Sequence, residues 1–167
     1  MKLAFSSLAC PSCTVDELIC KAKQYGFEGI ELRTLENTVN LFDLEAFQPE
    51  HIHETYQKFN QAGLPVLVIG TSVSFAKPDT GHRETQLEII KKFCILAQGL
   101  HCPYLRVFGG VIPEGQTYEQ VLARDIDGYK EAAEIAAFHG IKLLLETHDD
   151  FSMSSAQLPL LKALDGS

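Results

Sequence analysis

A glutamate and a histidine stand two residues apart at the end of an aliphatic run, residues 141–147. Such a run is typical of a strand, and residues two apart on a strand share a face, so Glu146 and His148 should point the same way. A carboxylate and an imidazole are ligands for Mg²⁺, Mn²⁺ or Zn²⁺, and a carboxylate beside such a metal can act as a base. The alternative is a solvated strand end at which His148 begins a polar turn. The spacing alone favours neither interpretation.

Two further aliphatic runs carry charge on one face. In residues 29–33, Glu31 shares a face with Arg33, and in residues 104–108 a single charged residue, Arg106, interrupts the apolar sequence. Because charges inside proteins need partners, we expect an ion pair between Glu31 and Arg106. The alternative is that both side chains contact a substrate directly.

Hydroxyl groups follow the most apolar run. Thr71 and Ser72 lie near the end of a strand expected over residues 65–75 and could donate hydrogen bonds to a polyol. Serine and threonine at a strand end are also ordinary turn residues, so a structural role is the alternative.

Cys10 and Cys13 have the C-x-x-C spacing of a redox pair and lie between a strand and a helix. However, Thr14 and Glu17 form the pattern of a capping box, which starts the helix after Cys13. Neither sulfur would then lie in the first helical turn, where the helix dipole lowers a thiol pKa. The pattern therefore disfavours a redox role.

The sequence that contains these residues alternates between short aliphatic runs and longer amphipathic segments. Strands are expected at residues 3–8, 29–33, 65–75, 104–108 and 141–147, and helices at 14–26, 49–61, 81–100, 117–139 and 154–164. Strand starts recur about every 34 residues, the length of one βα unit. The order predicts an α/β fold with a parallel sheet, either open and doubly wound or a barrel. No glycine-rich phosphate loop follows the first strand, which disfavours a nucleotide-binding open sheet.

Composition excludes several classes of protein. The chain has 167 residues, 46% of them hydrophobic and 22% charged, as in a soluble globular domain. Its net charge of −8 disfavours nucleic acid as a partner, and no apolar run is long enough to cross a membrane. Five irregularly spaced cysteines predict free thiols and a cytoplasmic location.

Three segments, residues 26–33, 105–110 and 143–149, resemble the xylose isomerase-like TIM-barrel superfamily of sugar phosphate isomerases and epimerases, which is related to AP endonuclease family 2. They read GFEGIELR, LRVFGG and LLLETHD, and they occur in the family's order. The resemblance implies a partial TIM barrel of about five βα units with parallel strands. The substrate class implied is a small sugar or sugar phosphate.

The resemblance also implies roles for single residues. In the family, the glutamate of the fifth strand binds a divalent metal (Mn, Mg, Zn or Co) and, in ketose epimerases, exchanges the proton at the inverted carbon. This catalytic and metal-binding role falls on Glu146. His148 would line the substrate pocket, with Glu31 and Arg106 on the inner wall and Thr71 as a further substrate contact.

The family's other metal ligands, an aspartate, a histidine and a second glutamate, come from strands six to eight. Eight units of about 34 residues would make about 270, so residues 1–167 are expected to form a single truncated barrel domain with an incomplete metal site. The first and fifth strands would be open edges, which predicts a homo-oligomer. The alternatives are a non-catalytic binding or assembly module, and an AP-endonuclease-like repair enzyme, which the net charge disfavours.

Overall fold

A single sheet of five parallel strands forms the centre of the computed structural model, which describes residues 1–164. Each strand pairs in parallel with the next along the chain, so β1 and β5 are the edges of the described sheet. The predicted α/β fold of five βα units is confirmed. The strands are β1 (Ala4–Ser6), β2 (Gly29–Leu32), β3 (Val66–Gly70), β4 (Tyr104–Phe108) and β5 (Lys142–Glu146).

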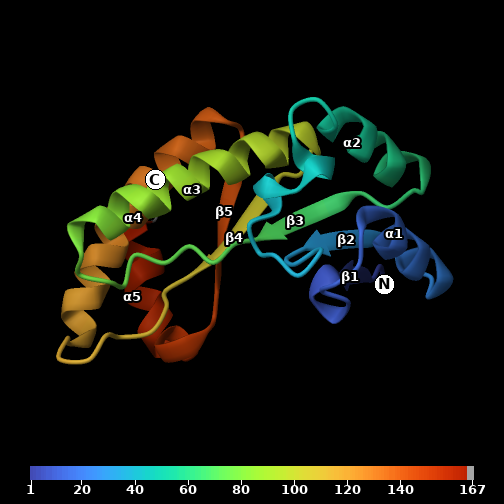
Figure 1. The fold of residues 1–167 in the computed structure, drawn as a ribbon. Helices are drawn as coiled ribbons and strands as arrows, with labels where there is room; N and C mark the ends of the chain where they lie inside the picture. The colour runs from blue at the N-terminus through green and yellow to red at the C-terminus, as the bar shows by residue number, and fades with distance from the viewer. Residues whose placement is uncertain (165–167) are drawn as a thin grey trace.

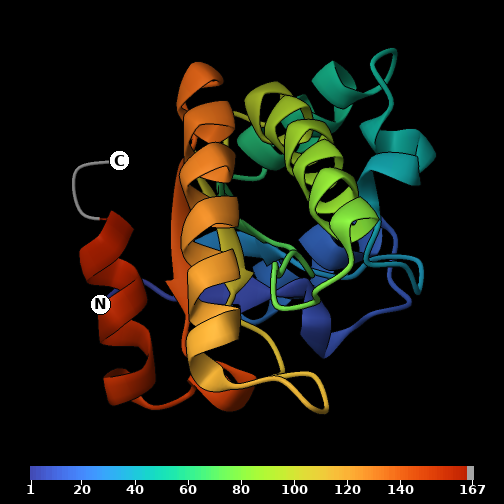
Figure 2. The same ribbon diagram turned by 90° about the vertical axis from the view of Figure 1, so that its left-hand side faces the viewer.

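Five α-helices alternate with these strands. Figure 1 shows α2, α3 and α4 over one side of the sheet. In Figure 2, α3 and α4 lie side by side in front of the strands. None of the helices in residues 1–164 is long and apolar enough to cross a membrane. Their bounds are α1 (Val15–Gln24), α2 (Ile52–Gln61), α3 (Thr80–Gly99), α4 (Tyr118–Phe138) and α5 (Ser154–Leu164).

Two helices begin at capping boxes. The Thr14 hydroxyl accepts a hydrogen bond from the backbone N–H of Glu17, whose carboxylate accepts one from the Thr14 N–H in return. Thr117 and Gln120 make the same reciprocal pair at the start of α4. Both starts agree with the sequence pattern, whereas α2 begins three residues later than expected, at Ile52, after two short 3₁₀ turns.

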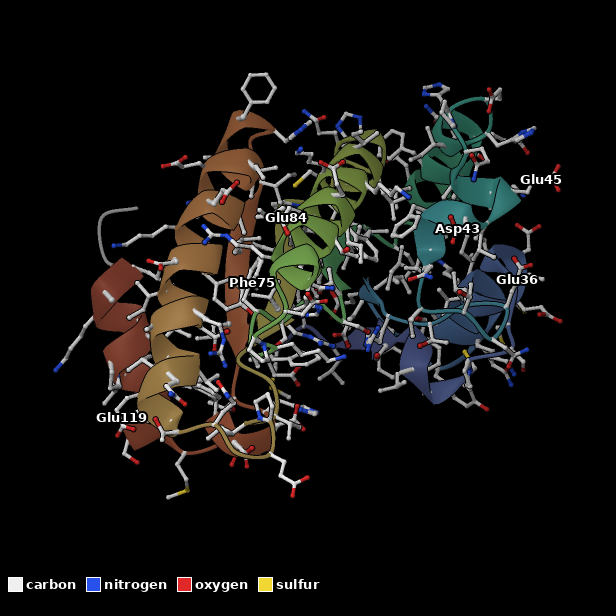
Figure 3. The ribbon with its side chains drawn as sticks, turned by 60° about the vertical axis from the view of Figure 1, so that its left-hand side comes forward. Glu36, Asp43, Glu45, Phe75, Glu84 and Glu119 are labelled. Carbon is white, nitrogen blue, oxygen red and sulfur yellow. The ribbon has the colours of Figure 1, made fainter. Side chains whose placement is uncertain are left out.

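Strand β3 ends at Gly70, five residues before the end expected from the sequence. The Thr71 hydroxyl donates to the carbonyl of Arg106 (2.9 Å) and accepts from the N–H of Val73 (3.2 Å), which turns the chain out of the strand. Beyond the turn, Phe75 is buried in the space left by Gly128 of α4, beside that helix in Figure 3. Val73, Phe75 and Ala76 are thus buried in a loop segment instead of a strand.

The core lies between the sheet and its helices. Alternate strand residues facing the helices are fully buried, and they pack with the apolar faces of α1 and α3. The intervening residues face the opposite side of the sheet and carry the charged groups of β2, β4 and β5. The buried set includes Ile30, Leu32, Ile69, Leu105, Val107, Leu18, Ile90 and Phe93.

Candidate functional site

The side chain of Arg106 lies between two carboxylates on the sheet face that points away from the helices. Its Nε is 2.9 Å from Oε2 of Glu146, and its Nη2 is 3.9 Å from Oε1 of Glu31. Strand register explains the meeting, because Glu146 is paired with Phe108, two residues beyond Arg106 on β4. The predicted ion pair between Glu31 and Arg106 is present, and the shorter contact is the one to Glu146.

Glu146 is the last residue of β5, and its backbone and its side chain have different partners. Its carbonyl accepts a hydrogen bond from Nε2 of Gln157 (2.6 Å), which ties the strand end to α5. Its Oε2 is buried and accepts no well-aligned hydrogen bond, so the contact with Arg106 is ionic. The side chain as a whole is still 39% exposed. Glu146 therefore combines a fixed position with access to a ligand, as a base or a metal ligand requires.

Arg33 is a second guanidinium on this face, although the sequence pattern did not mark it as a candidate site residue. Its Nη2 donates to the Ser72 hydroxyl (2.8 Å), while its Nη1 is buried without an acceptor in residues 1–164. Burial, and next the nearby positive charge of Arg106, lower the Arg33 pKa from its ordinary value. The signal that could have identified Arg33 was its place two residues after Glu31, on the same strand face.

His148 lies just past the end of β5, at the rim of this face. Its ring packs on Phe108 with centroids 5.1 Å apart, and its Nδ1 is 2.9 Å from Oδ1 of Asp149. The same turn is tied to the loop after β4, because Asp150 accepts a hydrogen bond from the Ile112 N–H (2.7 Å). His148 is half exposed, so it can contact a ligand without rearrangement of the turn.

Thr71 and Ser72 differ in what their hydroxyls do. The Thr71 hydroxyl is fully buried and bonded to backbone groups on both sides. The Ser72 side chain is exposed and contacts Arg33. We therefore assign the hydroxyl available at this strand end to Ser72.

The family resemblance implies a divalent metal at this place, and the donor set tests that implication. In the part of the chain that the structure describes, no three His, Cys, Asp or Glu side chains gather closely enough to hold a metal ion. Glu146 supplies one carboxylate, and Arg106 already neutralises one of its oxygens. Residues 1–164 do not form a metal site by themselves.

Cys10 and Cys13 are free thiols in the loop between β1 and α1. Burial, and next a hydrogen bond with Cys13, raise the pKa of Cys10 to about 11. Helix α1 starts at Val15, after both sulfurs, as the capping box predicted. A thiol with this pKa is protonated at neutral pH, which makes Cys10 a poor nucleophile.

Solved structures with a similar fold share little sequence with this chain. A probable 3-DHS dehydratase, AsbF, involved in petrobactin synthesis in Bacillus anthracis, is 22% identical, with a TM-score of 0.78 over 99% of this chain and 60% of that one. The protein IolI with a bound zinc atom is 17% identical, with a TM-score of 0.79, over 99% and 59%. D-psicose 3-epimerase with D-tagatose, from Clostridium cellulolyticum H10, is 15% identical, with a TM-score of 0.79, over 99% and 60%.

These likenesses establish the fold, and they show that the chain spans about 60% of the length of each structure. A search of the curated proteins gives no significant match. A family model described as xylose isomerase-like TIM barrel matches residues 19–161. The chain belongs to the xylose isomerase-like TIM-barrel family.

Proposed function

We propose that the chain carries part of the active site of a sugar isomerase or epimerase, acting on a small sugar or sugar phosphate in the cytoplasm. The observation that supports this most is the cluster of Glu31, Arg106 and Glu146 on one face of the sheet, with Glu146 at the carboxyl end of β5, the end at which proteins with this fold place their chemistry. Family membership and a structural neighbour named as a sugar epimerase agree with the proposal.

The proposed reaction moves a proton at a carbon next to a carbonyl. A divalent metal, when bound, would polarise the carbonyl and the adjacent hydroxyl and so acidify that C–H. Glu146 would take the proton and contribute a ligand to the metal. Arg106 holds the Glu146 carboxylate in place, and His148 and Glu31 would contact hydroxyl groups of the sugar.

The remaining metal ligands must come from outside residues 1–164. We propose that residues packed against the β5 edge supply them, either further residues of the same polypeptide or a second copy of the chain in a homo-oligomer. Within residues 1–164 no strand pairs with the outer edge of β1 or of β5, and several leucines near the β5 edge are about half exposed, as an association surface requires.

Exchange of the sugar's carbon-bound hydrogen with solvent tests the proposal. The protein is incubated with a panel of ketoses in D₂O with Mn²⁺, and deuterium incorporation is followed by mass spectrometry. We expect incorporation at the carbon beside the carbonyl, at a rate at least about 100-fold lower in Glu146→Gln. The matched control is Glu28→Gln, which changes an exposed glutamate elsewhere. Exchange that survives Glu146→Gln would refute the role of this carboxylate.

A further inference from the structure

We propose that Arg33 and Ser72 form a subsite for an anionic group on the ligand, either a carboxylate or a phosphate. The proposal rests on the proposed function only for the statement that the ligand is a sugar derivative. It assigns the position at which the charged substituent would bind.

Two arginines lie on the sheet face that points away from the helices, here called the inner face, and they differ in their partners. Arg106 contacts the carboxylates of Glu146 and Glu31, at 2.9 and 3.9 Å. No carboxylate oxygen of residues 1–164 lies within 4.0 Å of the Arg33 guanidinium, although Glu146 and Glu31 act on it from farther away. Burial and the neighbouring Arg106 disfavour the Arg33 cation more than the distant carboxylates favour it, and an anion in direct contact would stabilise it.

Gly70 makes room for both arginine side chains. A Cβ at this position would lie 2.6 Å from Nη2 of Arg106 and 2.8 Å from Cδ of Arg33. Since Gly70 is paired with Arg106 across β3 and β4, the absence of a side chain lets both guanidiniums cross the inner face of β3. The strand therefore holds two positive groups side by side at the site.

The donors of Arg33 suit an oxyanion. Nη2 has the neutral Ser72 hydroxyl as its partner, and Nη1 has none within the described chain. The backbone is fixed as well, because the Ser7 hydroxyl accepts from the N–H groups of Arg33 (2.8 Å) and Thr34 (3.1 Å). A planar guanidinium with unused donors matches the two oxygens of a carboxylate or phosphate, whereas a neutral hydroxyl needs no such group.

Three probes that differ in charge test the subsite: D-fructose, D-fructose 6-phosphate and D-gluconate. Their dissociation constants are measured by ligand-observed NMR at fixed ionic strength. We expect at least one anion to bind about tenfold more tightly than D-fructose. The tighter of the two anions then distinguishes a phosphate site from a carboxylate site.

Variants assign the preference to Arg33. Arg33→Gln is expected to abolish the preference for anions, and Ser72→Ala to reduce it severalfold. Lys130→Gln, which removes an exposed positive charge on α4, should leave it unchanged. Equal binding of all three probes, or an anion preference that survives Arg33→Gln in a folded variant, would overturn the proposal. If Arg33→Gln does not fold, an unchanged preference for anions in Ser72→Ala would overturn the proposal.

The test separates this inference from the proposed function. Anion preference without any hydrogen exchange would leave the subsite standing and refute the isomerase. Hydrogen exchange without any preference for anions would refute the subsite and leave the isomerase standing.

Discussion

Strands β4 and β5 pair along their whole length and have similar aliphatic sequences, yet they differ in burial. In β4, Leu105 and Val107 are at most 1% exposed, whereas their register partners on β5, Leu143 and Leu145, are only partly buried. A hollow of about 890 Å³, lined by residues such as Leu143 and Leu161, lies between α4, β5 and α5. The helices of this chain thus complete the core around β4 and leave β5 half covered, as a region that receives a partner would be.

Truncating one leucine in each strand should expose this difference most strongly. Leu105→Ala is expected to lower the free energy of unfolding by about 3 kcal/mol, because it opens a cavity in a closed core. Leu143→Ala should cost about 1 kcal/mol, because water already reaches its surroundings. Urea denaturation of both variants measures the two values. Equal losses would mean that the β5 side is as well packed as the centre.

Removing Arg106 compares the charged inner face with the outer surface of the helices. Arg106→Ala leaves Glu31 and Glu146 without a cation between them, and it should cost about 2–3 kcal/mol. Arg83→Ala is the control, since it removes an exposed ion pair with Glu131 (2.8 Å) and should cost less than about 1 kcal/mol. Similar losses of unfolding free energy in the two variants would show that the cluster around Arg106 stabilises the fold no more than an exposed ion pair does.

Asp125 on α4 should make stability fall as pH rises. Burial raises its pKa from 3.8 to about 8, with the backbone of Phe75 and the charged Arg124 acting in the opposite direction. The folded chain then holds a proton that the unfolded chain releases between about pH 4 and pH 8, so the contribution of Asp125 to stability is fully present below pH 4 and is lost across that range. After burial, the charge of Asp125 also helps to raise the pKa of Tyr118 and of Tyr129.

Asp125→Asn is expected to flatten this dependence and to stabilise the protein by about 2 kcal/mol at pH 8. Thermal unfolding between pH 4 and pH 9 provides the measurement. A wild-type protein whose stability rises over this range would contradict the assignment.

Gly70→Ala should produce the smallest change in stability, about 1 kcal/mol, with a clearer effect on binding. The new methyl group would displace the Arg33 and Arg106 side chains, which lie within 3 Å of its position. We expect severalfold weaker binding of D-fructose 6-phosphate or D-gluconate, measured by the same NMR titration. An unchanged affinity for these anions would show that Arg33 and Arg106 do not need the space above Gly70 for binding.

Local patterns predicted much of this fold. The capping box at Thr14 and Glu17 located the start of α1, and the two-residue period of strands placed Glu31 on the same face as Arg33. The contact between Glu31 and Arg106 followed because each buried charge needs a partner. These features depend on neighbours in sequence or on strand alternation.

Other features depended on contacts between distant segments. Ser72 meets Arg33 only because β2 and β3 end side by side, 39 residues apart in sequence. The buried loop after β3 needed the space at Gly128, which no local pattern indicates. Hydropathy alone could not distinguish such a loop from a longer strand.

We propose that Glu146 transfers a proton on a sugar in a site completed by residues outside 1–164, which a second copy of the chain can supply. The most direct measurement is the rate of deuterium incorporation per chain, with saturating ketose and Mn²⁺, over a range of protein concentrations that spans the monomer and the oligomer. If a second copy completes the site, the rate should rise with protein concentration, level off once the oligomer is fully formed, and disappear in Glu146→Gln. A preparation that binds the ketose but exchanges no hydrogen at any concentration would contradict the proposal.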